Sequence, residues 1–224
     1  MVEARVGDQE IPQKTPRIYL LLGSEGSGKS THGRLLAKSL GLPFFSTGDT
    51  LRAIRDDESD QSQKAQEVRR MFSDKKYLDA KALQEIMVSY FMDPIMSNGV
   101  VIDGMMRTEE EAVNFPQFLK NVGMENAEVN VISLRIPGWL GVERISRRNR
   151  DAHDTSLSTV KRMSEYYGGL GTRMHKVREV VERFGGRFEI VDAKGTDEIT
   201  AREFSDKNRQ RHIAEVYEKI IQTL

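Results

Sequence analysis

The sequence contains no cysteine among its 224 residues. This excludes disulfide bonds and cysteine-ligated zinc, and it fits a reducing compartment. The chain also has no net charge, because 34 lysines and arginines balance 34 aspartates and glutamates. A balanced chain creates no long-range field that would favour a nucleic acid or a membrane as its partner, so any attraction for phosphate must be local.

Long apolar stretches are missing as well. No segment approaches the ~18 consecutive apolar residues of a membrane-spanning helix, and the N-terminus has no secretory pattern. We therefore expect a cytoplasmic protein. Residues 1–16 are polar, with two prolines and no periodicity, and are expected to form a flexible lead. Residues 17–224 have a length that suits one α/β domain with insertions.

The most informative stretch joins a short apolar run, Ile18–Leu22, to the sequence GSEGSGKS at residues 23–30. It fits the pattern G-x-x-x-x-G-K-[ST], with a predicted strand before it and a predicted helix after it. Its glycines allow successive backbone N–H groups to turn inward around a polyphosphate, and the helix that follows directs its positive end at the same anion. In this phosphate loop, Lys29 would bind the β- and γ-phosphate oxygens and the Ser30 hydroxyl would bind Mg²⁺.

Strand and helix patterns alternate along the remaining chain. Strands are expected at Ile18–Leu22, Phe44–Ser46, Gly99–Asp103, Glu128–Leu134 and Arg187–Val191. Helical patterns cover Thr31–Leu40, Leu51–Met96, Thr108–Asn121, Pro137–Arg150, Leu157–Phe184 with a break near Gly168, and a final stripe from Ile213 to Leu224. Such alternation predicts a five-stranded parallel sheet with helices on both faces. Thr47–Arg52 is predicted to be a turn at a strand end, where such sheets bind ligands.

Asp103 closes the apolar strand Gly99–Asp103. A carboxylate at the end of a neighbouring strand is what the second half of a phosphate-loop site requires, because it must reach the metal ion or its water near Lys29. We therefore predict that Asp103 contributes to a magnesium site.

Three blocks of sequence resemble adenylate kinases and related nucleoside monophosphate kinases. Residues 23–52, GSEGSGKSTHGRLLAKSLGLPFFSTGDTLR, are similar to that family's phosphate loop, helix and S-T-G-D-x-[LI]-R turn. Residues 100–108, VVIDGMMRT, are similar to its apolar strand followed by D-G-F-P-R-T. Residues 161–167, KRMSEYY, are similar to its K-R-L-x-x-Y-Y helix. In order and spacing the resemblance spans residues 17–195, and it implies a P-loop NTPase-type α/β fold.

The resemblance implies a role for each matching residue. ATP would be bound by Gly23, Ser24, Glu25, Gly26, Ser27, Gly28, Lys29, Ser30, Thr31 and Arg144. The acceptor monophosphate would be bound by Thr47, Gly48, Arg52, Leu78, Gly104, Arg107 and Glu111. Mg²⁺ would be held by Ser30 and, through water, by Asp103. The catalytic set would be Lys29, Arg107, Arg148, Arg150 and Arg162.

These cations suit the implied reaction, since transfer between two polyanions needs several positive groups around the migrating phosphoryl. The resemblance also implies a helical insertion at 53–91 that closes over the monophosphate. A short lid at 149–154, without zinc, would close over ATP and exclude water. The implied partners are ATP with Mg²⁺ and a nucleoside monophosphate, without nucleic acid or membrane, and the chain would be a monomer.

Some residues depart from the family pattern on the acceptor side. Met105-Met106 replaces Phe-Pro, which removes a fixed φ before Arg107. The family's G-x-L-V-P-D stretch is only faintly echoed at residues 75–80. Glu111 stands where adenylate kinases have a glutamine that reads adenine. An ionised carboxylate accepts hydrogen bonds but cannot donate, so it suits guanine, which offers two adjacent donors. Alternatively, Glu111 is a first-turn acid favoured by the helix dipole.

The leading hypothesis is therefore an adenylate kinase that uses ATP and AMP. A kinase for GMP or a deoxynucleotide is the alternative suggested by Glu111. A nucleotide-binding protein with little catalytic activity is an alternative of another class, suggested by Met105-Met106 and the weak insertion motif.

Overall fold

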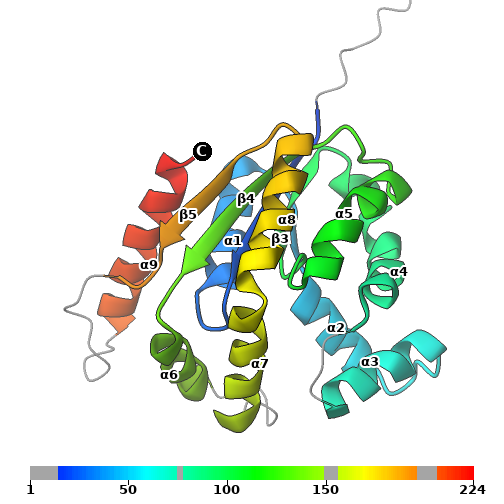
Figure 1. Cartoon of the computed structure of the whole chain (residues 1–224), viewed down its shortest axis with the longest axis horizontal. Coiled ribbons are helices and arrows are strands. Elements are labelled where there is room, and N and C mark those ends of the chain that lie inside the picture. The colour runs from blue at the N-terminus through cyan, green and yellow to red at the C-terminus, as the bar shows by residue number, and fades with distance from the viewer. Residues whose placement is uncertain (1–14, 75–77, 149–155, 196–205) are drawn as a thin grey trace, which may run out of the picture.

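The computed structural model describes residues 15–74, 78–148, 156–195 and 206–224. Within them, five strands form one sheet in the order β2-β3-β1-β4-β5, and every neighbouring pair is parallel (Figure 1). The strands are β1 (Arg17–Gly23), β2 (Phe44–Ser46), β3 (Gly99–Asp103), β4 (Glu128–Arg135) and β5 (Phe188–Asp192). The predicted parallel α/β sheet is confirmed.

Helices follow the strands as the periodicity indicated. They are α1 (Lys29–Leu40), α2 (Thr47–Asp56), α3 (Gln63–Asp74), α4 (Ala80–Phe91), the short 3-10 helix η1 (Pro94–Met96), α5 (Glu109–Asn121), α6 (Gly138–Arg148), α7 (Ser156–Gly168), α8 (Leu170–Arg183) and α9 (Asp206–Gln222). The predicted break in the helix near Gly168 is confirmed, because α7 and α8 are separated at Gly169.

One local prediction was wrong. Residues 47–52 do not form a strand-end turn, because α2 begins at Thr47 directly after β2. Ser46 makes this possible, since its extended backbone ends the strand and its hydroxyl accepts the N–H of Asp49 at 3.3 Å. Such a side-chain cap satisfies one of the N–H groups that a helix start leaves without a partner.

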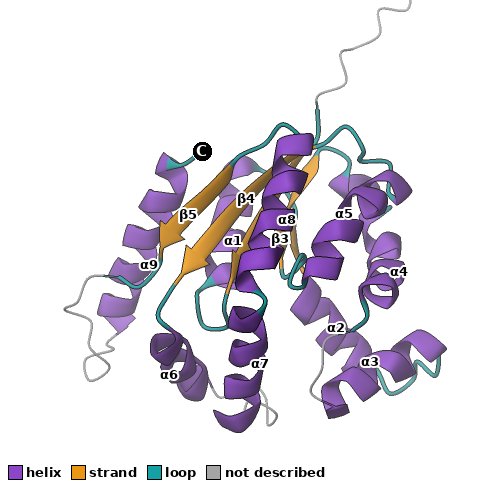
Figure 2. Ribbon diagram, in the orientation of Figure 1, coloured by secondary structure: helices purple, strands orange, loops and turns teal. Residues whose placement is uncertain are grey.

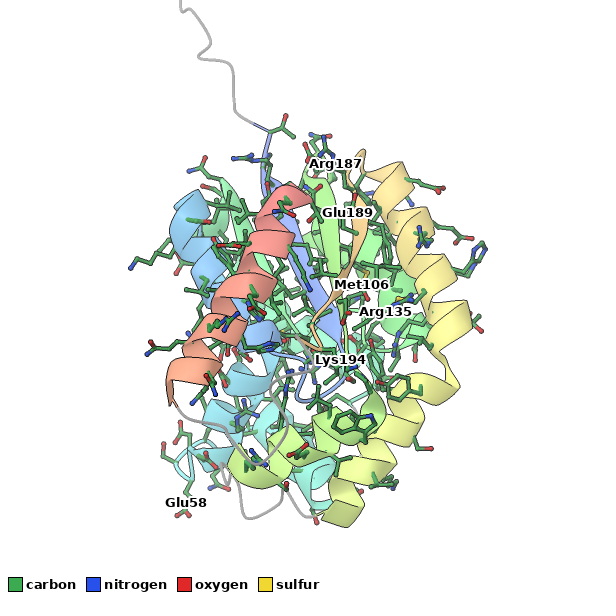
Figure 3. All side chains as sticks on the ribbon, turned by 90° about the vertical axis from the view of Figure 1, so that its left-hand side faces the viewer. Glu58, Met106, Arg135, Arg187, Glu189 and Lys194 are labelled. Atoms are coloured by element: carbon green, nitrogen blue, oxygen red, sulfur yellow. The ribbon has the colours of Figure 1, made fainter. Side chains whose placement is uncertain are left out.

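Successive side chains of β1 alternate between two separate cores. Ile18, Leu20 and Leu22 belong to one buried cluster, and Tyr19 and Leu21 belong to another. Successive side chains of a strand point to opposite faces, so a strand that is apolar at every position must be covered on both sides. Figure 2 shows helices around the sheet accordingly, and in Figure 3 α9 and α8 lie on opposite sides of the strands.

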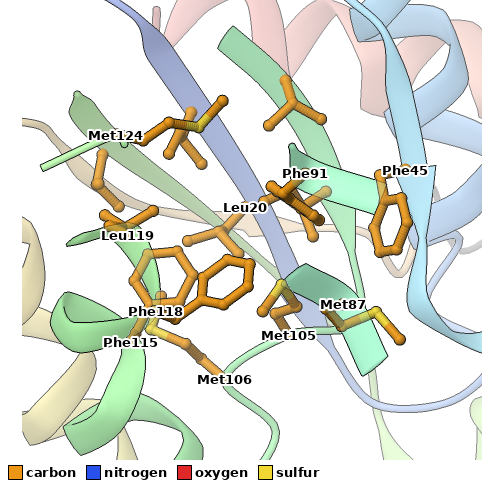
Figure 4. Close-up of a cluster of buried hydrophobic side chains, with 14 of the residues drawn as sticks. Leu20, Phe45, Met87, Phe91, Met105, Met106, Phe115, Phe118, Leu119 and Met124 are labelled. Atoms are coloured by element: carbon orange, nitrogen blue, oxygen red, sulfur yellow. The ribbon is translucent and has the colours of Figure 1, made fainter. Parts of the chain in front are cut away.

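The larger core lies between the sheet and helices α4, α5 and α8, and it is rich in phenylalanine and methionine (Figure 4). The rings of Phe91 and Phe118 meet edge to face with centroids 5.0 Å apart, and Phe45 meets Phe91 at 4.9 Å. Met105 and Met106 are buried in the same cluster, at 3% and 1% exposure. The two residues that replace Phe-Pro therefore serve as core side chains beside the site.

The loops that follow β1 and β3 leave the sheet in opposite directions. The chain passes from β1 through α1 to β2, and from β3 through α5 to β4, while β1 and β3 are neighbours. Side chains of α1 belong to one core and those of α5 to the other, so the two helices cover opposite faces. Ligands of open α/β sheets bind at such a switch point, beyond the carboxyl ends of the strands. No helix within the described ranges is long and apolar enough to cross a membrane.

Core packing in the larger cluster can be tested at Phe118, which is fully buried. We predict that Phe118→Ala lowers the free energy of unfolding by about 3–5 kcal/mol, because the lost ring leaves a cavity beside Phe91 and Phe115. Val113→Ala on the same helix, at a side chain that is 55% exposed, should change it by less than about 0.5 kcal/mol. Urea denaturation measures both, and equal effects would contradict the packing described.

Candidate active site

The first part of the site is the phosphate loop between β1 and α1. Gly28 precedes the helix with a φ of 95°, a left-handed conformation that glycine adopts at little cost. The ammonium group of Lys29 donates hydrogen bonds to the carbonyl oxygens of Gly23 at 2.8 Å and Ser24 at 2.9 Å. These bonds fold the side chain back over the loop. Its charge therefore lies where the start of α1 already favours an anion.

Ser30 and Asp103 form the second part. The hydroxyl of Ser30 donates to Oδ2 of Asp103 at 2.5 Å. Pairing of Leu21 with Asp103 across β1 and β3 places this carboxylate level with the start of the phosphate loop. Magnesium prefers oxygen ligands and retains several waters, so a hydroxyl and a carboxylate side by side at an anion site fit this ion. Ser30 and Asp103 are the residues that could hold it.

Two arginines from different elements lie beside Gly48 in the first turn of α2. A Cβ on Gly48 would be 3.4 Å from Nη2 of Arg52 and 3.7 Å from Nη2 of Arg107. Arg52 is on α2, whereas Arg107 follows β3. The N–H groups of guanidinium match the oxygens of a phosphate, and a residue without a side chain leaves space between the two groups. This arrangement can bind a second phosphate near the loop.

Asp49 orients one of these arginines. Its carboxylate accepts a hydrogen bond from Nη2 of Arg52 and pairs with Arg34 of α1 at 2.9 Å. Burial alone would raise the pKa of Asp49, but the hydrogen bond and charge of Arg52 and the charge of Arg34 outweigh it, so the pKa is lowered. All three side chains are at least 41% exposed, so these pairs add little to stability. Their effect is to hold Arg52 in one orientation.

Glu111 is buried at the start of α5. The Thr108 hydroxyl accepts the N–H of Glu111 at 3.1 Å, and Oε2 of Glu111 accepts the N–H of Arg107 at 3.0 Å. Burial raises the pKa of Glu111, while the charges of Arg107 and Arg173 and the backbone hydrogen bonds oppose that rise. One carboxylate oxygen is thus bound to the backbone, as expected for an acid in the first turn of a helix. The base-reading role stays a prediction.

Comparisons with known proteins indicate the family of the chain. A family model described as an AAA domain matches residues 22–161. The adenylate kinase of Mycobacterium tuberculosis (strain ATCC 25618 / H37Rv) is 30% identical over 190 residues, which cover 82% of this chain and 94% of that protein. The adenylate kinase of Corynebacterium urealyticum is 29% identical over 185 residues, 80% of this chain and 92% of that protein. The chain belongs to the adenylate kinase family.

In this member of the adenylate kinase family, Arg144 ties the phosphate loop to the segment that follows β5. Its guanidinium donates to the carbonyl oxygen of Gly26 at 3.2 Å, and to those of Ala193 at 3.4 Å and Lys194 at 3.3 Å. It also lies 3.0 Å from Nε2 of His212 on α9. Because a guanidinium only donates, Nε2 of His212 must be the acceptor and carries no proton.

Two buried histidines lie near this arginine. His32 on α1 is 3% exposed and His212 is 7% exposed. Burial, with smaller contributions from His212 and Arg144, lowers the pKa of His32 to about 4. Burial and the charge of Arg144 also lower the pKa of His212, and Glu215 only partly opposes this. Both imidazoles are therefore neutral at pH 7.

Other residues predicted from sequence line the same region. Ser24 and Ser27 of the loop and Thr47 at the start of α2 are buried, and their hydroxyls have no hydrogen-bond partner among the described residues. Glu25 and Thr31 are half-buried. A Cβ on Gly104 would overlap the guanidinium of Arg107, so Gly104 is what allows this arginine to fold back.

Three further predicted residues lie in or beside helices α4, α6 and α7. Leu78 is partly buried against the larger core and lies just before α4. Arg148 is the last residue of α6, and Arg162 lies within α7. Arg150 and the predicted lid at 149–154 lie outside the described residues, as do residues 1–14 of the predicted lead.

Sequence reasoning missed two residues that contact this site. His212 carries no motif and lies far along the chain from Arg144, and Arg173 is one of 34 basic residues. Nη1 of Arg173 donates to the carbonyl oxygen of Arg107 at 2.6 Å. The one available signal was Arg173's position on a helix that follows the KRMSEYY block, which by itself indicates nothing about burial.

The buried state of His212 predicts a pH dependence of stability. Because its folded-state pKa is below the unfolded value near 6.5, the unfolded chain binds protons more readily as pH falls. We expect the free energy of unfolding to be highest above about pH 7 and to decrease as the pH falls below the unfolded pKa. His212→Gln, which can still accept from Arg144, should give a shallower decrease in urea denaturation between pH 7.5 and pH 5; an equally steep decrease would contradict a neutral His212.

Proposed function

We propose that this protein is a cytoplasmic, Mg²⁺-dependent ATP:AMP phosphotransferase. One observation carries the proposal: the phosphate loop after β1, Asp103 at the end of β3 and the second cation site at Gly48 after β2 lie at the same edge of one sheet, in which β3 is between β1 and β2. Two phosphate sites at one sheet edge suit transfer between two nucleotides rather than hydrolysis of one. The adenylate kinases that resemble the chain over 80% or more of its length support ATP and AMP as the pair.

In the proposed reaction, the residues of the chain bind and orient the two nucleotides and neutralise the charge of their phosphates. The phosphate loop would hold the β- and γ-phosphates of ATP, with Lys29 on their oxygens. Ser30 and Asp103 would hold Mg²⁺, and the ion would supply positive charge beside the phosphoryl oxygens. Arg52 and Arg107 would bind the acceptor phosphate and spread its charge, so that an acceptor oxygen can approach the γ-phosphorus. No side chain needs to become a nucleophile.

AMP is the proposed acceptor because of how Glu111 is engaged. Its Oε2 atom accepts the Arg107 N–H at 3.0 Å, and the side chain is only 6% exposed. A carboxylate held in this way is a poor partner for the two donors of guanine. Thr47 offers a buried hydroxyl without a partner among the described residues, and it can both donate to and accept from adenine. GMP remains the alternative that the assay below tests.

We predict that the purified protein transfers phosphate from ATP to AMP with Mg²⁺, at a kcat of roughly 1–100 per second as kinases do. Formation of ADP is measured with AMP, GMP, CMP and UMP as acceptors. Lys29→Met should lower kcat/KM for AMP by about 100-fold or more, because it removes charge from the migrating group. Glu111→Gln should keep AMP as the preferred acceptor.

Two results would overturn this assignment. Preference of the wild type for GMP, shifted toward AMP by Glu111→Gln, would mean that Glu111 reads the base. Calorimetric binding of ATP with no turnover of any monophosphate would favour the nucleotide-binding protein instead.

We predict that Gly48→Ala raises KM for AMP by about 10-fold or more, because the methyl group would occupy the space between Arg52 and Arg107. The nearest guanidinium atom would be 3.4 Å away, an ordinary contact, so the fold and KM for ATP should be unaffected. Gly171→Ala is the matched control, since a Cβ there meets nothing within 4 Å. Steady-state kinetics with each substrate varied separate the two variants. An unchanged KM for AMP would place the acceptor phosphate elsewhere.

A further inference from the structure

A buried arginine on α8 lies next to the acceptor side of the site. Arg173 is only 3% exposed, although arginine is almost never fully buried unless it is paired. Its Cζ atom lies 4.2 Å from the centroid of the Tyr166 ring on α7, which covers one face of the guanidinium. Removing a guanidinium from water is costly unless hydrogen bonds and an opposite charge compensate it. Both are present around Arg107.

Arg173 and Glu111 bind the two backbone polar groups of the same residue. Nη1 of Arg173 donates to the carbonyl oxygen of Arg107 at 2.6 Å. Oε2 of Glu111 accepts the N–H of Arg107 at 3.0 Å. The two buried side chains have opposite charges and come from different helices, α8 and α5, which pack against each other. Arg107 is therefore held from both sides by groups within the body of the domain.

The turn that carries Arg107 has a backbone that needs such support. Met106 has a φ of 54°, a left-handed conformation that residues with a side chain adopt at a cost. Its side chain is buried among the larger core's residues (Figure 4). Gly104 also has a positive φ, 98°, and the Arg107 guanidinium folds back against it toward Gly48. A small rotation of the Arg107 backbone would swing this long side chain away from Gly48.

We propose that Arg173 is a positioning residue for Arg107. Together with Glu111 it fixes the Arg107 backbone, so that the Arg107 guanidinium faces the acceptor phosphate beside Gly48. The consequence for catalysis rests on the proposed function, whereas the fixation of the backbone does not. Arg173 contributes no contact to the substrate in this role, so its loss affects one substrate through the placement of Arg107.

The kinetic test is Arg173→Met, which keeps the length of the side chain and removes its charge and donors. We expect kcat/KM for AMP to fall by about 10–100-fold, because small displacements of a binding group have effects of that size. KM for ATP should stay within about twofold of the wild type. Arg178→Met on the same helix, at an exposed arginine stacked over Phe188, is the matched control and should leave both unchanged.

A double variant separates positioning from stability. Arg173→Met removes one of the two positive charges near the buried Glu111 carboxylate, the other being Arg107, so a lower thermal midpoint is expected. Arg173→Met/Glu111→Gln also removes the charge of Glu111, and the glutamine oxygen can still accept the Arg107 N–H. The double variant should recover most of the midpoint and keep the low kcat/KM for AMP. Arg173→Lys keeps the charge and can still donate a hydrogen bond but lacks the planar guanidinium, so it should be intermediate. Recovery of both midpoint and kcat/KM in the double variant would overturn the proposal, because Arg173 would then only neutralise Glu111.

Hydrogen exchange of the Arg107 amide tests the fixation without using activity. In the wild type this amide should be protected, and Arg173→Met and the double variant should increase its exchange rate by about 10-fold or more, with the Leu119 amide in α5 unchanged. Absence of turnover in the wild type would refute the proposed function. The exchange rate of the Arg107 amide would still show whether Arg173 fixes the Arg107 backbone. Unchanged exchange, or increased exchange with an unchanged kcat/KM for AMP in an active enzyme, would show that Arg173 does not position Arg107.

Discussion

The site depends on the register among three parallel strands. Leu21 of β1 is level with Asp103 of β3, and Asp103 is level with Ser46 of β2. Because parallel strands end at the same edge of a sheet, the segments that follow begin side by side. The phosphate loop, Asp103 and the start of α2 are therefore neighbours without any direct pairing between their loops. A shift by one residue would turn Asp103 toward the opposite face and separate it from Ser30.

Three cations of the site are held by acceptors of the protein. Lys29 is bound to loop carbonyls, Arg52 to Asp49, and Arg144 to carbonyl oxygens from the loop and from the residues that follow β5. Several positive groups at one edge of the sheet would otherwise repel one another. Carbonyl oxygens and a half-exposed carboxylate are modest partners, so a polyphosphate with several charges can replace them at little cost.

The sequence predicted the sheet and most helices because the two patterns that define them are local. Alternating apolar runs and the phosphate loop pattern depend on neighbouring residues, and both are visible without a structure. The start of α2 at Thr47 was missed, since the S-T-G-D block suggested a ligand turn and the capping by Ser46 gives the same residues a helical role. Arg173 and His212 were missed for a different reason: their partners are distant in sequence, and only tertiary packing makes an arginine or a histidine buried.

Met105-Met106 stands where the family has Phe-Pro, and contacts from other parts of the chain compensate for the missing proline. A proline would restrict the backbone before Arg107 through its ring. In this chain the restriction comes from outside the turn, through burial of Met106 and through Glu111 and Arg173 on either side of Arg107. Arg107 is thereby tied to α5 and α8, whereas Arg52 is on α2, which packs against α3. A phosphate bound by both arginines, as proposed, would therefore link α2 to the turn after β3.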